Sequence, residues 1–153
     1  LVTVLMAETP RILFIGDLNF YSKGASRLKS VERLGAEVRA LSHAAVGDQS
    51  RGYVPPSLAF RIGWKLGFHV DEVGVNAKTL AAVRDFRPDV VWIEKGNMFR
   101  PATLAAIHAI HPAAVICSYT DDDMFNRLNN TWYYRRGLKH YDIVFSTKSF
   151  NAN

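Results

Sequence analysis

Short, mostly apolar runs alternate along the chain with segments of helical periodicity, and this alternation restricts the fold more than any other feature. The runs centre on Leu13, Val38, Val91, Ile116 and Val144. Short runs without strict alternation are typical of strands that are covered on both faces, as in a parallel sheet. The sequence therefore predicts an α/β fold: a Rossmann-like, doubly wound parallel sheet with helices on both faces, in one domain.

The apolar spacing and the cap residues place the individual elements. The predicted strands span residues 11–15, 37–41, 90–93, 114–119 and 142–146. The predicted helices span residues 24–34, 57–66, 77–86, 101–111 and 132–139. The signals for their ends are Gly35 and Gly67 as stops, Ser57, Asn76 and Thr131 as N-caps, and Pro101 in a first turn. Leu28, Val31 and Leu34 form one predicted apolar stripe, and Leu58, Ile62 and Leu66 repeat every four residues.

Length and composition limit the class of protein. A chain of 153 residues can bury one core, so we expect one domain over residues 11–153 after a leader of uncertain order at 1–10. The net charge of +5 suits an anionic ligand, a membrane face or nucleic acid, but the basic residues are spread over the helices, which favours a solvated surface. Cys117 is the only cysteine, which predicts a buried, inert thiol in a reducing, cytoplasmic compartment. No stretch is long enough to cross a bilayer.

Polar clusters follow three of the predicted strands, and the carboxyl ends of parallel strands share one edge where ligands bind. These clusters are Gly16, Asp17 and Asn19 after the first strand, Glu94, Lys95 and Gly96 after the third, and Asp121, Asp122 and Asp123 after the fourth. The first lacks the GxGxxG fingerprint, which disfavours a dinucleotide site, although the helix after it can accept an anion. Each cluster also has an interpretation without a ligand. The first can be an ordinary turn, the second can form ion pairs among its charged residues and their neighbours, and the aspartates of the third can cap a helix or form a turn. Asp-x-Asp spacing alone is a weak metal signal, and we predict no metal.

Four segments in the same order resemble bacterial glycosyltransferases related to the spore-maturation protein CgeB. RILFIGDLNFYSKGASRLKSVERLGAEVRAL resembles the start of these enzymes. RPDVVWIEKGNMFRPATLAAI is similar to their stretch in which a strand ends in an acid followed by Lys-Gly and a helix that starts with proline. YTDDDMFN and YDIVFSTKSFN resemble the next two strand ends. The resemblance covers nearly the whole chain from Arg11 onward.

The resemblance implies the N-terminal, acceptor-side domain of a two-domain GT-B glycosyltransferase, with the C-terminal donor-binding domain absent from this sequence. Such an enzyme moves a sugar from a nucleotide-sugar donor to an acceptor hydroxyl, without a bound metal or other cofactor. We expect Asp122 or Asp123 to act as the base that takes the proton of the acceptor hydroxyl, and Asp17 is the second choice for this role. We expect the substrate to contact Gly16, Asn19, Glu94, Lys95, Gly96 and Asp121. The implied partners are an acceptor of unknown identity and the donor on the second domain, with no nucleic acid, and the chain alone should fold without transferring sugar.

A second hypothesis is a receiver-like or flavodoxin-like regulatory module that does no catalysis. A receiver needs an acidic pair after the first strand, an aspartate after the third and a lysine after the fifth. Lys148 fits the last position, but Asp17 is a single acid and Glu94 occupies the place of the central aspartate. A dehydrogenase-type domain is disfavoured by the missing glycine fingerprint.

Overall fold

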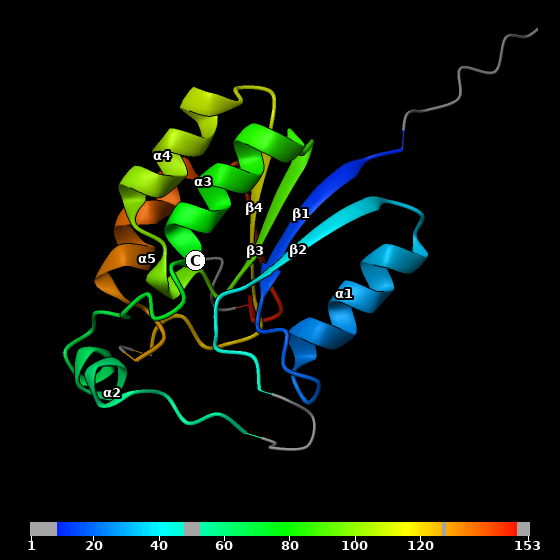
Figure 1. Cartoon of the computed structure of the whole chain (residues 1–153). Helices are drawn as coiled ribbons and strands as arrows, with labels where there is room; N and C mark the ends of the chain where they lie inside the picture. Colours follow the sequence, from blue (N-terminus) through cyan, green and yellow to red (C-terminus); the bar gives the residue numbers. More distant parts are fainter. Residues whose placement is uncertain (1–8, 48–52, 127, 150–153) are drawn as a thin grey trace, which may run out of the picture.

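A single sheet of five parallel strands forms the centre of the protein (Figure 1). The computed structural model describes residues 9–47, 53–126 and 128–149. The strands are β1 (Arg11–Gly16), β2 (Glu37–Ser42), β3 (Val90–Glu94), β4 (Val115–Thr120) and β5 (Ile143–Ser146), in the order β2-β1-β3-β4-β5. All four neighbouring pairs are parallel. The predicted α/β class is therefore confirmed, and the fold is a Rossmann-like or flavodoxin-like single domain.

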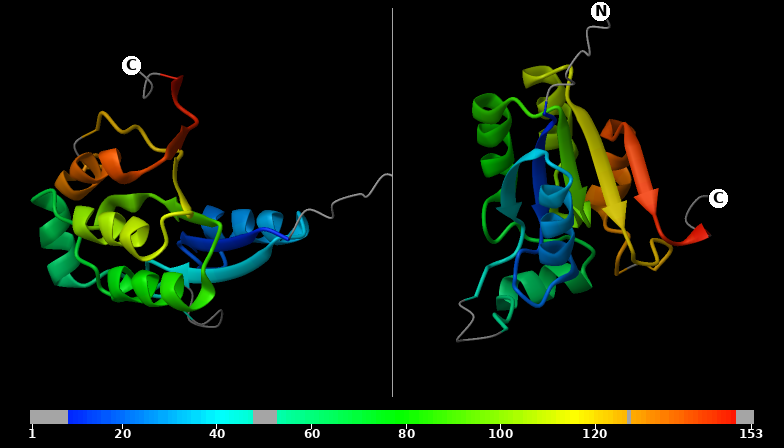
Figure 2. Two further views of the ribbon diagram at one scale, coloured as in Figure 1. Left: turned by 90° about the horizontal axis from the view of Figure 1, so that it is seen from above. Right: turned by 90° about the vertical axis from the view of Figure 1, so that its right-hand side faces the viewer.

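Helices cover both faces of this sheet (Figure 2). The helices are α1 (Lys23–Arg33), α2 (Leu58–Lys65), α3 (Val75–Phe86), α4 (Pro101–Ile110) and α5 (Trp132–Gly137), with short 3₁₀ helices at Gly96–Met98 and Leu138–His140. α1 lies on one face against β1 and β2, whereas α3 and α4 lie on the other. α2 lies below the carboxyl ends of the strands (Figure 1). No helix in the described ranges is long and apolar enough to cross a membrane.

The main core lies between the sheet and the helices α3 and α4. β1 contributes Leu13 and Ile15, β3 contributes Val91 and Ile93, and β4 contributes Ile116, all with 0% exposure. They pack on buried helix residues, namely Val83, Phe86, Leu104 and Ile107. Burying each such side chain stabilises the fold by about 1.5–3 kcal/mol, so this layer fixes the positions of the strand ends.

An aromatic row crosses the other face of the sheet. The Trp92 ring stacks on Tyr119, with centroids 5.7 Å apart, and on Phe145, with centroids 5.6 Å apart. Tyr119 and Phe145 are register partners on β4 and β5, so their side chains leave the sheet on the same face. The Arg27 guanidinium lies over the Tyr119 ring at 4.5 Å from its centroid. This contact joins α1 to the aromatic row.

Two predictions about helix ends are wrong. Leu34 was expected on the buried stripe of the first helix, but it is 86% exposed, because α1 ends at Arg33 and the chain turns away. Gly35 follows with φ +83°, a left-handed conformation that glycine adopts without steric cost. The predicted fifth helix also ends early, because residues 138–140 form a 3₁₀ helix instead.

Asn76 is not the N-cap of α3, as the sequence predicted. α3 begins at Val75, and the Asp71 carboxylate accepts hydrogen bonds from the backbone N–H groups of Val75 at 2.7 Å and Asn76 at 3.0 Å. These bonds lower the pKa of Asp71 against the opposing effect of its burial. The Asn76 side chain donates to the Met98 carbonyl and accepts from the Arg100 N–H. Asn76 therefore ties α3 to the segment after β3.

The sheet has a switch point between β1 and β3. β1 leads through α1 to β2 on one side, whereas β3 leads through α4 to β4 on the other side and the opposite face. The segments after β1 and β3 therefore diverge at the carboxyl edge. In open α/β sheets this divergence leaves a crevice that binds ligands.

Candidate functional site

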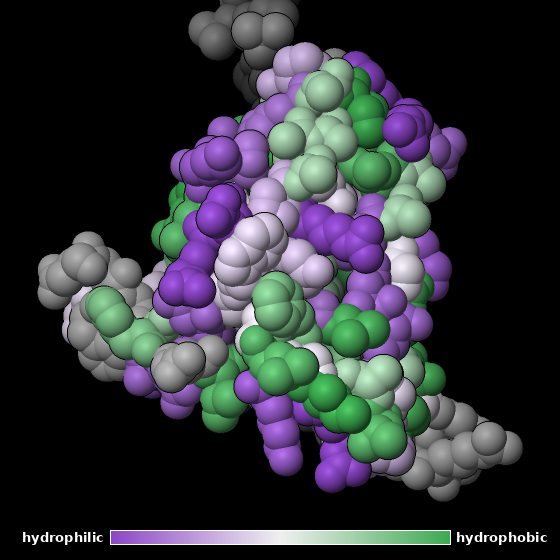
Figure 3. Space-filling model, turned by 90° about the vertical axis from the view of Figure 1, so that its left-hand side faces the viewer, coloured by the Kyte–Doolittle hydropathy of each residue, from purple (hydrophilic) through white to green (hydrophobic). Residues whose placement is uncertain are grey.

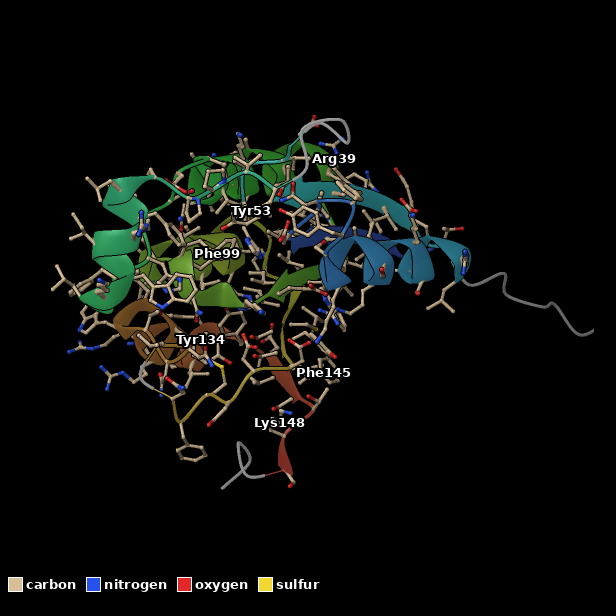
Figure 4. The ribbon with its side chains drawn as sticks, turned by 90° about the horizontal axis from the view of Figure 1, so that it is seen from below. Arg39, Tyr53, Phe99, Tyr134, Phe145 and Lys148 are labelled. Atoms are coloured by element: carbon tan, nitrogen blue, oxygen red, sulfur yellow. The ribbon has the colours of Figure 1, made fainter. Side chains whose placement is uncertain are left out.

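A pocket of about 400 Å³ lies at the carboxyl edge beside the switch point. One part of its wall carries charged groups, including Asp17, Lys95, Asp121 and Asp122. Another part is aromatic and comes from the segments after β1 and β2 and from α2, namely Tyr21, Tyr53, Phe60 and Trp64. Figure 4 looks onto this edge and shows Tyr53 over the strand ends, apart from Lys148 beyond β5. The pocket is therefore concave, half apolar and supplied with a few polar groups, as ligand sites usually are.

An ion pair between α1 and β3 lines the pocket. Both Glu94 oxygens accept hydrogen bonds from the Arg27 guanidinium, one from Nε and one from Nη2 at 3.1 Å. Glu94 is 3% exposed, and the Arg27 side chain is 26% exposed. The hydrogen bond that Arg27 donates to Glu94 raises the pKa of Arg27 above its usual value. Glu94 therefore neutralises Arg27 and anchors α1, and its carboxylate is already occupied.

Two further ion pairs link the aspartates after β4 to lysines from other segments. Lys23 Nζ lies 2.9 Å from Asp121 Oδ2, and Lys95 Nζ lies 2.9 Å from Asp122 Oδ2. Burial alone would raise the pKa of Asp121, but the hydrogen bond from Lys23 and the nearby positive charges outweigh it and lower that pKa. Lys95 holds its position with φ +48°, which is strained for a residue with a side chain. Asp121 is therefore held ionised next to a cation.

Asp17 lines the pocket and is oriented by Asn19. Asp17 Oδ1 accepts hydrogen bonds from the Asn19 N–H at 3.0 Å and from Asn19 Nδ2 at 2.7 Å. Asn19 Nδ2 also donates to the Ala45 carbonyl, and its Oδ1 accepts from the Gly47 N–H. Asn19 is 3% exposed, and these bonds use both of its side-chain donors. Asn19 thus positions Asp17 and joins the segments after β1 and β2.

The two predicted glycines allow close approaches beneath the site. A Cβ on Gly16 would lie 3.3 Å from a Glu94 oxygen, and a Cβ on Gly96 would lie 2.2 Å from the Tyr141 hydroxyl. Gly96 is buried against Tyr141 and does not line the pocket. Gly24, at the start of α1, leaves room for the Asp17 carbonyl, which would lie 2.4 Å from an added Cβ.

Asp123 lies outside the pocket, although the sequence analysis favoured it as a base. It is exposed, and its Oδ1 accepts a hydrogen bond from the Phe125 N–H at 2.9 Å. Its backbone carbonyl accepts from Asn129 Nδ2 at 3.0 Å. These contacts are those of a turn residue, so Asp123 stabilises the segment after β4.

Two histidines that lack any ligand spacing in the sequence both lie in the pocket wall. His69 is 6% exposed, and its ring contacts Phe60 and Trp64 at centroid distances of 5.5 and 5.0 Å. His43 follows β2, and its backbone N–H donates to the Gly16 carbonyl. Desolvation by burial lowers the pKa of each histidine to about 4. Both imidazoles are therefore neutral at pH 7.

Burial of His69 predicts a loss of stability in mild acid. Between about pH 6.5 and pH 4 the unfolded chain binds a proton at His69 that the folded chain does not bind, so stability falls as the pH falls. We expect a slope of about 1 kcal/mol per pH unit from this group. His69→Phe, which keeps the ring contacts, should flatten the pH dependence of urea unfolding in this window. An unchanged slope would show that folded His69 takes up the proton.

Sequence reasoning missed several residues of the pocket. Arg27 is one of the basic helix residues for which the sequence predicted a solvated surface, because the spacing within one helix does not reveal an acidic side chain from β3. Tyr53, Trp64 and His69 come from a stretch without strand–helix alternation, and only the fold brings them to the strand ends. The aromatic residues between 53 and 69 were the available signal, since loops at this edge form binding sites. No group of three or more metal-ligating side chains occurs in the part of the chain that the structure describes.

Comparison with known proteins shows a likeness in fold. No family model matches the sequence, and no curated protein matches it. A Burkholderia pseudomallei response regulator with a phosphorylated aspartic acid, a calcium ion and citrate matches with TM-score 0.51 and 13% identity, over 92% of this chain and 61% of that one. A LuxR-family response regulator from Aurantimonas has TM-score 0.50 and 14% identity, over 95% and 79%.

An α-glucosyltransferase in complex with UDP and a 13-mer DNA containing an HMU base has TM-score 0.53 and 14% identity. The match covers 90% of this chain but only 38% of the glucosyltransferase. At such identities these structures share the fold alone with this protein. The chain therefore has the Rossmann-like or flavodoxin-like architecture that glycosyltransferase and receiver structures both contain.

Proposed function

We propose that this domain is the acceptor-side half of a glycosyltransferase, in which a separate domain supplies the nucleotide-sugar. The observation that supports it most is the mixed wall of the pocket, which combines the aromatic rings of Tyr53 and Trp64 with carboxylates from the strand ends. Sugars present C–H faces that pack on aromatic rings and hydroxyl groups that donate to carboxylates. This wall suits an acceptor of that chemistry. Among the described residues, the cations that line the pocket are Lys23, Arg27 and Lys95, and each is paired with a carboxylate, which suits a diphosphate poorly.

In this proposal Asp17 is the base, because its geometry suits proton transfer best among the predicted aspartates. Asn19 fixes Asp17 through Oδ1, and no described residue donates a hydrogen bond to Oδ2. Asp17 takes the proton of the acceptor hydroxyl while the hydroxyl oxygen forms a bond to the anomeric carbon of the donor. The bond from that carbon to the nucleotide breaks in the same step, and the nucleotide leaves with the electron pair. Asp121 and Asp122 are paired with lysines and serve to hold acceptor hydroxyls.

Removing the aromatic wall should weaken acceptor binding. We expect simple oligosaccharides to bind the purified domain weakly, with a Kd near ~1 mM, and nucleotide-sugars to show no tight binding. Trp64→Ala should lower the affinity about tenfold, because a stacked ring contributes roughly 1 kcal/mol or more. Trp132→Ala is a matched control, since Trp132 is 39% exposed and Trp64 38%, and Trp132 lies outside this pocket.

Chemical-shift titration of the isolated domain would measure these affinities. Equal effects of the two tryptophan variants would contradict the pocket as the sugar site. Tight binding of a nucleotide-sugar to this chain would contradict the division between acceptor and donor domains.

The second candidate function is a receiver-like regulatory module. The fold neighbours include response regulators, and Asp17 and Lys148 follow β1 and β5. Against it, the last residue of β3 is Glu94 in place of the central aspartate, and this side chain is buried and bound through both oxygens to Arg27. Incubation with acetyl phosphate, followed by measurement of the protein mass, distinguishes the receiver from the glycosyltransferase domain. Stoichiometric gain of one phosphoryl group, lost in Asp17→Asn, would support the receiver and oppose the glycosyltransferase proposal.

A further inference from the structure

Helix α2 presents its apolar stripe to solvent. Leu58, Ile62 and Leu66 are four residues apart, so they lie on one side of the helix, and they are 69%, 52% and 69% exposed. The opposite side carries Phe60 and Trp64, which contact the His69 ring and line the pocket. α2 contains no fully buried residue. The helix is therefore held by its aromatic side, and its aliphatic side is left exposed.

This apolar surface continues from α2 onto α5. The Phe68 ring lies 6.3 Å from Trp132 and 5.9 Å from Tyr133, centroid to centroid, and the Trp132 N–H donates to the Gly67 carbonyl at 3.3 Å. Phe68 is 46% exposed and Trp132 39%. We call these five exposed side chains the α2–α5 patch: Leu58, Ile62, Leu66, Phe68 and Trp132. Figure 3 views the side of the molecule where α2 lies and shows hydrophobic side chains gathered in its lower part, bordered by hydrophilic ones.

Positive charge borders the patch. Arg61 and Lys65 flank the stripe on α2, and Arg135 and Arg136 lie on α5, with the Arg136 guanidinium 5.0 Å from the centre of the Trp132 ring. Residues 58–70 and 124–141 contain six of the 19 basic residues of the chain and no acidic residue. The rest of the chain holds 13 basic and 14 acidic residues. The net positive charge of the protein therefore comes entirely from the two segments that carry the patch.

We propose that the α2–α5 patch docks on the surface of an anionic lipid bilayer. An amphipathic helix with aliphatic and aromatic residues on one side and Lys or Arg beside them is the composition of an interfacial helix. Neither element spans a membrane, so docking combines shallow insertion of the apolar side chains with attraction of the basic rim to lipid headgroups. Nucleic acid would use the basic residues but would leave Leu58, Ile62 and Leu66 exposed to water.

The docked orientation follows from the two sides of α2. With the aliphatic stripe against lipid, Phe60 and Trp64 face away from the bilayer and into the pocket. The pocket would then lie next to the membrane surface, within reach of the polar part of a lipid-linked or surface-bound ligand. The docking proposal itself does not depend on the proposed glycosyl transfer, because it rests only on exposed residues outside the strand ends.

Vesicle sedimentation tests the proposal with the full chain and two lipid mixtures. We expect binding to vesicles of phosphatidylcholine and phosphatidylglycerol, weak or no binding to phosphatidylcholine alone, and loss of binding at high salt. Leu58→Ser with Leu66→Ser should lower the partition coefficient at least tenfold. Arg135→Gln and Arg136→Gln should each lower it about fivefold. Leu34→Ser and Arg33→Gln, at the end of α1, are controls that should leave binding unchanged.

Three results would overturn the inference. The first is no binding to the anionic vesicles, or equal binding to both mixtures. The second is anionic binding that the double leucine variant leaves intact, which would mean adsorption by charge alone. The third is a different partner for the patch. In that case the protein would bind duplex DNA, or self-associate in sedimentation velocity, without binding vesicles, and the patch variants would abolish that interaction. All five variants change exposed residues, so unchanged thermal unfolding would show that the fold is intact.

Discussion

Arg27→Met is expected to lower the free energy of unfolding by about 3–5 kcal/mol, because it leaves the Glu94 carboxylate buried without its partner. Glu94 is 3% exposed, and its two oxygens are bonded to the Arg27 guanidinium. Methionine keeps much of the aliphatic stem, so the loss reports on the ion pair more than on packing. The cation–π contact with Tyr119 is lost as well, and contributes about 1 kcal/mol of the total. Urea unfolding followed by circular dichroism would measure the change.

Arg39→Met is the matched control for this prediction. Arg39 pairs with Asp85 and also lies over an aromatic ring, with its guanidinium 4.7 Å from the centre of Phe86. The Asp85 side chain is 74% exposed, so water solvates that carboxylate when the arginine is removed. We expect a loss of about 1 kcal/mol or less. If both variants lost the same stability, burial of Glu94 would not be the source of the effect, and Arg27 would not anchor α1 to β3.

The sheet could be predicted from sequence because its strands are specified locally. Leu13, Val91 and Ile116 lie in apolar runs, and burial on the core side then fixes which residues face α3 and α4. Each predicted strand end either matches the observed one or differs from it by a single residue, which is the usual uncertainty of element boundaries. The predicted N-caps Ser57 and Thr131 are also confirmed. Their side chains accept hydrogen bonds from backbone N–H groups in the first turns of α2 and α5.

The pocket could be predicted only in part, since half of its wall depends on contacts between distant segments. Asp17, Lys95, Asp121 and Asp122 follow strands, so the parallel sheet alone brings them to one edge. The aromatic half depends on how α2 lies across that edge, and nothing in the spacing of Tyr53 or Trp64 indicates it. Asn76 shows the same limit at a helix start. An asparagine before a helix resembles a cap, but Asp71 reaches the N–H groups first.

The observed ion pairs also explain why acidic residues after strands do not by themselves identify a catalytic base. The hydrogen bond from Lys23 and the nearby cations lower the pKa of Asp121 despite its burial, and Glu94 and Asp122 are each paired with a cation from another segment. A general base works best when its pKa lies close to the pH at which the enzyme operates. Asp121 and Asp122, which are paired with lysines, therefore suit hydrogen bonding to substrate hydroxyls, whereas Arg27 already occupies both oxygens of Glu94. Asp17 differs from them because its described partner is the neutral amide of Asn19.

Asp17→Asn is expected to lower glycosyl transfer by roughly 10²–10⁴-fold, the usual contribution of a general base. The assay joins this domain to a donor-binding domain, because the proposed reaction needs donor and acceptor at near-attack distance and this chain alone should show no turnover. Nucleotide release at saturating acceptor would give kcat. Asparagine keeps the Oδ1 contact with Asn19, so KM should change little. Asp123→Asn is the control, because Asp123 lies outside the pocket, and we expect its kcat to stay within about twofold of the unmodified protein.

The outcome at Asp122 decides how the result is interpreted. Asp122 Oδ2 is paired with Lys95 Nζ, so Asp122→Asn should raise KM and change kcat by less than tenfold, as expected for a group that only binds the acceptor. A large loss of kcat in Asp122→Asn, with Asp17→Asn nearly unchanged, would move the base to the segment after β4. Turnover by this domain alone would contradict the proposed separation of donor and acceptor, because one pocket would then have to hold both substrates. Unchanged kcat in both variants would leave His43, a neutral imidazole in the same pocket, as the next base to test.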